Sequence, residues 1–161
     1  MAQDSALTLK GWIEFVAVLF IPAIVLELLL TLHLPGPLST VAALALYLIP
    51  LFQAALVHEF GHLIFAKRRG LNARIRLPGL SDFRAFPFVP VLKTELGGRE
   101  ITRKEDRVIT VAGPLFNLLF MIVYLLLVLS TMRISFVLMT IFNLAFFIYN
   151  LGELLSGIFS K

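Results

Sequence analysis

The residues with the clearest chemistry are two histidines and a glutamate near the middle of the chain. His58, Glu59 and His62 fit the pattern HExxH, and the whole chain has only 3 histidines. On a helix, histidines four residues apart point to the same side and can bind one Zn²⁺, while the glutamate beside them can take a proton from water. We therefore predict a zinc site with His58 and His62 as metal ligands and Glu59 as the catalytic base.

The composition indicates that this motif lies in a membrane protein. Of the 161 residues, 59% are hydrophobic and 15% are charged, whereas soluble domains average about 45–50% apolar and about 25% charged residues. The excess lies in long apolar runs, which suit a bilayer. The absence of cysteine excludes disulfides, thiolate metal sites and thiol redox chemistry. We predict an all-α polytopic fold that forms a single membrane domain over residues 1–161.

Four apolar segments are long enough to cross a bilayer, at about residues 11–34, 38–66, 108–130 and 134–159. The loop at 67–107 holds 11 of the 14 lysines and arginines. Because such residues accumulate in cytoplasmic loops, we expect this loop and both termini to be cytoplasmic in a multi-pass protein of a prokaryotic plasma membrane. Orientation and contact with anionic lipid headgroups account for the basic charge, so we expect no nucleic-acid partner.

The basic loop contains two strand-like pieces, at residues 73–77 and 86–91, with turn residues at Pro78-Gly79 and Gly97-Gly98. Its prolines are typical of edge strands. We predict a small cytoplasmic β-structure that lies against the membrane face.

The position of the motif favours a buried site. At 1.5 Å per residue, His58 would lie roughly 13 Å inside the boundary that Lys67 marks. Glu59 could not easily reach water from that depth, and a carboxylate buried in a membrane needs a partner. These residues therefore fit a functional centre better than polar side chains at an interface.

The sequence HEFGH within a transmembrane segment resembles the site-2 protease family of intramembrane zinc metalloproteases. Residues 112–117, AGPLFN, are similar to the family's AGPxxN segment, and the Asn-Leu pairs at 143–144 and 150–151 are similar to pairs that precede its LDG motif. The resemblance covers about residue 38 to the C-terminus. It implies a three-helix metalloprotease core, to which the segment at 11–34 is an N-terminal addition.

The resemblance also implies roles for three asparagines. Asn117 is expected near the active site, where it would hold or polarise the substrate peptide, and Asn143 and Asn150 are expected to bind substrate as well. The residues alone leave Asn117 equally consistent with a polar contact between helices. Independently of the family, the small residues before Pro114 would let two helices approach closely, and the proline leaves a carbonyl without its helical partner.

One segment departs from the family pattern. The third zinc ligand of the family is the Asp of LDG, but Leu155-Ser156-Gly157 stands at that place, and the chain has no aspartate after Asp106. One alternative is that Ser156 marks a lost ligand and a protein that binds zinc poorly. The other is that Glu153 replaces the aspartate from one turn earlier.

Position favours Glu153 as the third metal ligand. It would lie roughly 12 Å inside the boundary marked by Lys161, close to the depth of His58. It is the carboxylate of the last apolar segment and shares a polar stripe with Asn143, Asn150 and Gly157. The competing interpretation is that Glu153 reaches water from a frayed helix end.

These features lead to one principal function and two alternatives. We predict zinc-dependent hydrolysis of a peptide bond in a transmembrane protein or peptide, near its cytoplasmic side, with the loop strands binding the unwound substrate by β-augmentation. The first alternative is a catalytically inactive relative that acts as a structural or regulatory membrane subunit. The second is a small ion-binding protein or transporter that uses Glu14, Glu27 and the histidines, although paired broken helices are missing. The sequence leaves open whether the chain forms a homo- or hetero-oligomer.

Overall fold

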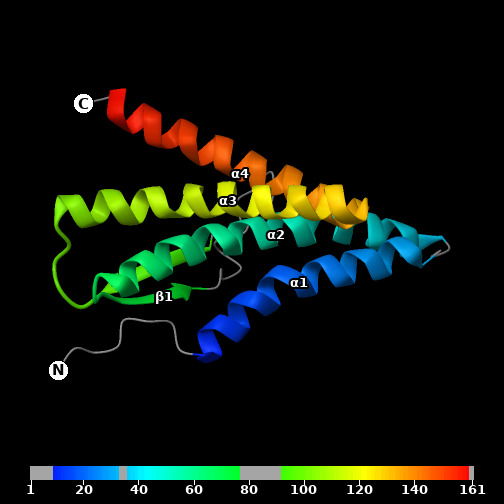
Figure 1. Ribbon diagram of the computed structural model, residues 1–161, viewed down its shortest axis with the longest axis horizontal. Helices are drawn as coiled ribbons and strands as arrows, with labels where there is room; N and C mark the ends of the chain where they lie inside the picture. Colours follow the sequence, from blue (N-terminus) through cyan, green and yellow to red (C-terminus); the bar gives the residue numbers. More distant parts are fainter. Residues whose placement is uncertain (1–8, 33–35, 77–91, 160–161) are drawn as a thin grey trace.

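The computed structural model describes residues 9–32, 36–76 and 92–159 of the chain. Its four helices are α1 (Leu9–Thr31), α2 (Pro37–Arg68), α3 (Arg103–Thr131) and α4 (Ile134–Phe159), and two strands, β1 (Asn72–Arg76) and β2 (Lys93–Gly97), lie between α2 and α3 (Figure 1). The predicted all-α fold with a small β-structure is confirmed.

Three helices of the described residues are long and apolar enough to cross a membrane, at Leu38–Arg68, Arg103–Thr131 and Ile134–Ser156. They correspond to the second, third and fourth predicted segments. The first predicted segment forms α1, in which Phe20–Thr31 is a shorter apolar stretch. Many large apolar side chains on the outer faces of the helices are exposed, as expected where lipid replaces water.

The helices are arranged as a bundle of antiparallel neighbours (Figure 1). The β-hairpin, the start of α1 and the end of α4 lie at one end of the molecule, and the end of α1, the start of α2 and the α3–α4 connection lie at the other. α3 packs against both α2 and α4. Toward its C-terminus, α4 diverges from α3.

Local sequence signals account for where α2 and α3 begin and end. Gly36, with a φ of 58°, precedes Pro37 at the first position of α2. The basic Lys67 and Arg68 lie in the last turn of α2, where the helix dipole stabilises positive charges. Thr102 caps α3 in a capping box with Glu105. α3 ends at Thr131 and is followed by its C-cap residue Met132, which has a left-handed backbone with a φ of 54°.

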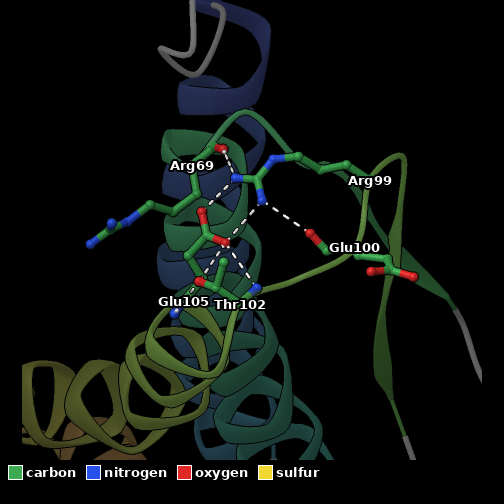
Figure 2. A network of polar contacts seen from close by, with 5 residues as sticks. All are labelled: Arg69, Arg99, Glu100, Thr102 and Glu105. Atoms are coloured by element: carbon green, nitrogen blue, oxygen red, sulfur yellow. Dashed lines mark hydrogen bonds and ion pairs between the residues drawn. The ribbon is translucent and has the colours of Figure 1, made fainter.

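A network around Arg99 joins the ends of α2 and α3 to the hairpin (Figure 2). The Arg99 guanidinium pairs with the Glu105 carboxylate and also donates to the Arg69 carbonyl at 3.2 Å and the Glu100 carbonyl at 3.1 Å. The hydrogen bond and charge of Glu105 raise the pKa of Arg99. Because Glu105 also accepts from the Thr102 backbone N–H, this network holds the end of α2 beside the start of α3.

The two strands form an antiparallel hairpin in which Ala73 pairs with Leu96 and Ile75 pairs with Thr94. β1 agrees with the predicted strand at 73–77 to within one residue. The predicted strand at 86–91 and the turn at Pro78-Gly79 lie outside the described residues. β2 was not predicted from the sequence, because KTELG contains one β-branched residue and little apolar alternation.

A polar clasp attaches α1 to the α3–α4 connection. The Ser135 hydroxyl donates to Glu27 Oε1 at 2.5 Å, and Arg133 Nη1 lies 3.6 Å from Glu27 Oε2. Glu27 is therefore paired at the end of the bundle opposite the hairpin. The side chain of Glu14, the other carboxylate considered for ion binding, lies outside the described residues.

Candidate functional site

The site is built where α2 and α3 are in close backbone contact. A Cβ atom on Gly61 of α2 would lie 2.5 Å from the Ala112 carbonyl oxygen and 3.0 Å from the Gly113 Cα of α3. Contacts that short do not occur between real side chains and backbone, so the approach requires glycine at this position. The close packing expected for residues 112–114 is present, and it brings the motif of α2 against α3.

The three motif residues lie together on α2. The Nε2 atoms of His58 and His62 are 3.0 Å apart, and the potential ligand atoms of His58, Glu59 and His62 all lie within 4.8 Å of one another. Glu59 is buried, and the two imidazoles are partly buried. The spacing predicted from HExxH is therefore realised in a single cluster.

Both imidazoles donate from Nδ1 to groups on α3. His62 Nδ1 is 2.6 Å from the Ile109 carbonyl oxygen, and His58 Nδ1 is 2.9 Å from Asn117 Oδ1. Both partners are oxygens that can only accept. The amide of Asn117 is oriented by its Nδ2, which donates to the Ala54 carbonyl at 2.9 Å. In a neutral imidazole with a protonated Nδ1, the lone pair is on Nε2.

These hydrogen bonds leave the Nε2 lone pairs of His58 and His62 facing each other at 3.0 Å. Two acceptors at that distance repel unless a proton or a metal ion lies between them. Two imidazoles oriented by Nδ1 hydrogen bonds, with a carboxylate close by, form a donor set that suits zinc. The chemistry of the cluster therefore fits a zinc ion.

Gly113 keeps the space beside the imidazoles open. A Cβ atom at this position would lie 2.6 Å from His62 Nε2 and 2.7 Å from His58 Cε1. Any larger residue would fill the space that a metal ion at the two Nε2 atoms requires. His62 bonds to the Ile109 carbonyl. The next carbonyl, that of Thr110, has no helical donor because Pro114, four residues later, lacks an N–H.

Behind His58, a chain of buried amides crosses the bundle; we call Asn117, Asn143, Gln53 and Tyr124 the polar ladder. Asn117 Nδ2 donates to Asn143 Oδ1 at 3.1 Å, Asn143 Nδ2 donates to Gln53 Oε1 at 3.0 Å, and Gln53 Nε2 donates to the Tyr124 hydroxyl at 2.9 Å. All four residues are at most 1% exposed. The ladder therefore connects α2, α3 and α4 to one of the proposed metal ligands.

The polar ladder places two of the three predicted substrate-binding asparagines beside the site. Asn117 contacts His58 directly and Asn143 contacts Asn117, whereas Asn150 donates to the Phe146 carbonyl of its own helix at 2.7 Å. Substrate binding by these side chains stays a prediction. Gln53 and Tyr124 were not predicted from the sequence, although a glutamine one and a half turns before HExxH in an apolar helix was a usable signal.

Glu59 has a partner on the hairpin that the sequence analysis also missed. The Thr94 hydroxyl of β2 lies 2.7 Å from Glu59 Oε2 and 3.1 Å from the Glu59 carbonyl oxygen. The contact joins residues 35 positions apart. No local pattern marks a threonine in a short strand as part of a site.

The two candidates for the third ligand position lie on the last turns of α4. The side chain of Glu153 lies outside the described residues, and Ser156 is exposed. Within the described part of the chain, the group able to hold a metal is His58, Glu59 and His62. The third ligand therefore stays a prediction.

Comparison with known proteins gives one match. A family model described as Peptidase family M50 matches residues 46–160, more than two thirds of the chain. The matched region includes the motif of α2, the hairpin, α3 and α4, and begins after α1. No curated protein and no solved structure matches the chain.

Proposed function

The chain belongs to peptidase family M50, the site-2 protease family, and from this premise we propose that it is an intramembrane zinc metalloprotease. Its reaction would be hydrolysis of a peptide bond in a transmembrane protein or peptide near the cytoplasmic side. The observation that best supports this is the approach of the two histidine Nε2 atoms to 3.0 Å beside the buried Glu59.

In the proposed mechanism, His58 and His62 hold the zinc ion, and Glu153 is the proposed third ligand. Bound zinc supplies Lewis acidity, which makes water more acidic and polarises a carbonyl group. Glu59 takes the proton of the attacking water and later gives it to the leaving amine nitrogen. Its position supports this role, because its carboxylate lies within 4.8 Å of the ligand atoms of both histidines.

The substrate would have to be unwound before cleavage, because a transmembrane helix keeps its carbonyls in hydrogen bonds. The hairpin offers a place for the unwound segment, since in the described part of the chain its sheet has two strands and thus two outer edges. Asn117, Asn143 and Asn150 are proposed to compete for backbone groups of that segment. The first two would have to exchange bonds of the polar ladder to do so.

One observation favours a second candidate, a catalytically inactive membrane subunit with a structural or regulatory role. Leu155-Ser156-Gly157 stands where the family's LDG is expected, so the third ligand is provided by Glu153 or is missing. Two protein ligands would hold zinc more weakly than the three of a typical catalytic site.

Metal content separates the two candidates. Detergent-purified wild type would be compared by mass spectrometry with Glu153→Ala, Ser156→Asp and a His58→Ala/His62→Ala control. We expect nearly one zinc per wild-type chain, and loss of zinc in Glu153→Ala and in the control. Zinc that is absent from the wild type and gained by Ser156→Asp would instead support the inactive subunit.

Activity is tested with Glu59→Gln, which keeps the size of the side chain and removes its basicity. In proteoliposomes containing a model transmembrane substrate, we expect cleavage by the wild type and a loss of at least about 100-fold in Glu59→Gln. Equal cleavage by the two proteins, at equal zinc content, would rule out the proposed mechanism.

A further inference from the structure

The hairpin presents one polar side chain to the site. The register of β1 and β2 puts Ala73, Ile75, Thr94 and Leu96 on one face of the sheet. Ala73 is buried, and Ile75 and Leu96 pack against the hydrophobic core. Thr94 is the polar member of this inner face, and its side chain meets Glu59 of α2.

The outer face of the hairpin carries charges that pair with one another in this register. Glu95, the residue after Thr94, pairs with Arg74 at 2.8 Å and lies 3.6 Å from Arg76. A slip of one residue would turn Lys93 and Glu95 inward and Thr94 outward. Because the inner face packs on buried apolar residues, that alternative is strongly disfavoured, and the Thr94 hydroxyl stays directed at Glu59.

The contact between Thr94 and Glu59 is specific to one carboxylate oxygen. The hydroxyl lies 2.7 Å from Glu59 Oε2, a length typical of a strong O–H···O bond. In the described part of the chain, no other hydrogen-bond partner of the Glu59 side chain is present. The hydroxyl bond on Oε2 restricts how the carboxylate plane can turn.

We propose that Thr94 is a positioning residue for Glu59, an inference that rests on the proposed role of Glu59 as the base. The hydroxyl holds the carboxylate beside His58 and His62, where the water that Glu59 deprotonates would lie. The membrane-associated hairpin is then part of the catalytic machinery, because it supplies the group that orients the base. It also links the strand edges proposed for substrate to the residue that acts on water.

Thr94→Val is the sharpest test, because it replaces the hydroxyl by a methyl group of similar size and keeps the β-branched shape. Thr94→Ser is the matched control that keeps the hydroxyl. In the proteoliposome assay with the zinc-loaded protein, we expect Thr94→Val to lower kcat by about 10- to 100-fold, the range typical of residues that orient a site from outside it. We expect KM and zinc content to stay near wild type, and Thr94→Ser to keep most of the kcat.

A second readout does not depend on cleavage. The carboxylate stretching band of Glu59 is obtained as the infrared difference between the wild type and Glu59→Gln. We expect this band to shift in Thr94→Val and to stay in place in Thr94→Ser.

Three results would overturn the proposal: wild-type kcat in Thr94→Val, an unshifted Glu59 band, or zinc loss in Thr94→Val, which would make the hydroxyl a structural group. Failure of the proposed protease function gives a different result from failure of the Thr94 proposal. If Glu59 is not the base, Glu59→Gln and the wild type will have equal activity. An inactive wild type whose Glu59 band shifts in Thr94→Val would support the positioning contact while removing the protease function.

Discussion

At the scale of single residues, acceptors on α3 orient the two histidines of α2 that we propose as metal ligands. The Ile109 carbonyl and Asn117 Oδ1 hold the protons of both imidazoles on Nδ1, so the Nε2 atoms are left as ligand atoms. Partners of this kind fix the orientation and basicity of metal-binding imidazoles. The HExxH motif supplies the two proposed ligands, and α3 determines which nitrogen of each imidazole would face a metal ion.

Removing the acceptor of His58 should weaken zinc binding. We expect Asn117→Leu to lower zinc affinity by about 10- to 100-fold, because His58 loses the bond that holds its Nδ1 proton. Competition with a fluorescent zinc chelator measures this change. The control is Asn150→Leu, which removes a bond within α4 and should leave the affinity near wild type. Equal affinities in the two variants would contradict a role for Asn117 in orienting His58.

Adding one methyl group at Gly113 should abolish the metal site. In Gly113→Ala, the new Cβ would meet both imidazoles, at 2.6 Å from His62 Nε2 and 2.7 Å from His58 Cε1. We expect zinc content and cleavage to be lost. Gly152→Ala on α4 is the matched control, because its Cβ would meet nothing within 4 Å. Normal zinc content in Gly113→Ala would show that the metal binds elsewhere.

At the scale of elements, the polar ladder is the specific connection between α2, α3 and α4. Apolar packing gives helices in a membrane little preference for one rotation over another, because lipid is as apolar as their side chains. The amides of Gln53, Asn117 and Asn143 supply that preference, since each finds its partner in one arrangement. The rotation of α2 that presents the motif to α3 is therefore coupled to α4.

The far end of the ladder should contribute measurably to stability. Tyr124→Phe keeps the ring and removes the acceptor of Gln53 Nε2, so we expect a loss of about 1 kcal/mol, within the range of hydrogen bonds between membrane helices. Unfolding in mixed micelles measures it. In a double-mutant cycle, Gln53→Leu combined with Tyr124→Phe should cost less than the sum of the single changes. Strictly additive losses would show that the two side chains do not interact.

The sequence predicted the helices better than it predicted the contacts between them. The apolar runs and the basic or breaking residues that end them located α2, α3 and α4 to within a few residues, since these signals are local. The bonds from Thr94 to Glu59 and from Gln53 to Tyr124 join residues 35 and 71 positions apart. Their formation depends on strand register and helix rotation, which the order of residue types does not reveal.

The candidate site divides in the same way. His58, Glu59 and His62 were recognisable because their spacing matches one turn of a helix, and Asn117 was recognisable through the family motif. The third ligand was not, because the segment at 153–157 departs from that motif. A substituted ligand has no spacing rule to identify it, and only metal binding by variants of α4 can assign it.

At the scale of the whole molecule, the hairpin and the α3–α4 connection lie at opposite ends of the bundle (Figure 1). The basic residues concentrate at the hairpin end, which predicts that this end faces the cytoplasm. The exposed Met132 marks the other end. The hairpin, where we propose that the substrate segment binds, and the clasp that holds α1 would then lie at opposite sides of the membrane.

The absence of cysteine makes this orientation easy to test. We expect a membrane-impermeant thiol reagent to label Met132→Cys on intact cells and to label Glu100→Cys only after the cells are permeabilised. Both parent side chains are exposed, so access depends on the side of the membrane. The opposite pattern would invert the topology and place the hairpin outside the cell.

The polar ladder also has a consequence for how the chain is made. α2 leaves the ribosome before α3 and α4, so Gln53 and His58 enter the bilayer before Tyr124, Asn143 and Asn117 can receive or donate their hydrogen bonds. In hydrocarbon such groups must find a partner, which favours early capture of the later helices by α2. Assembly of the three helices would then also orient His58, the proposed metal ligand, because Asn117 takes part both in the polar ladder and in the bond to His58.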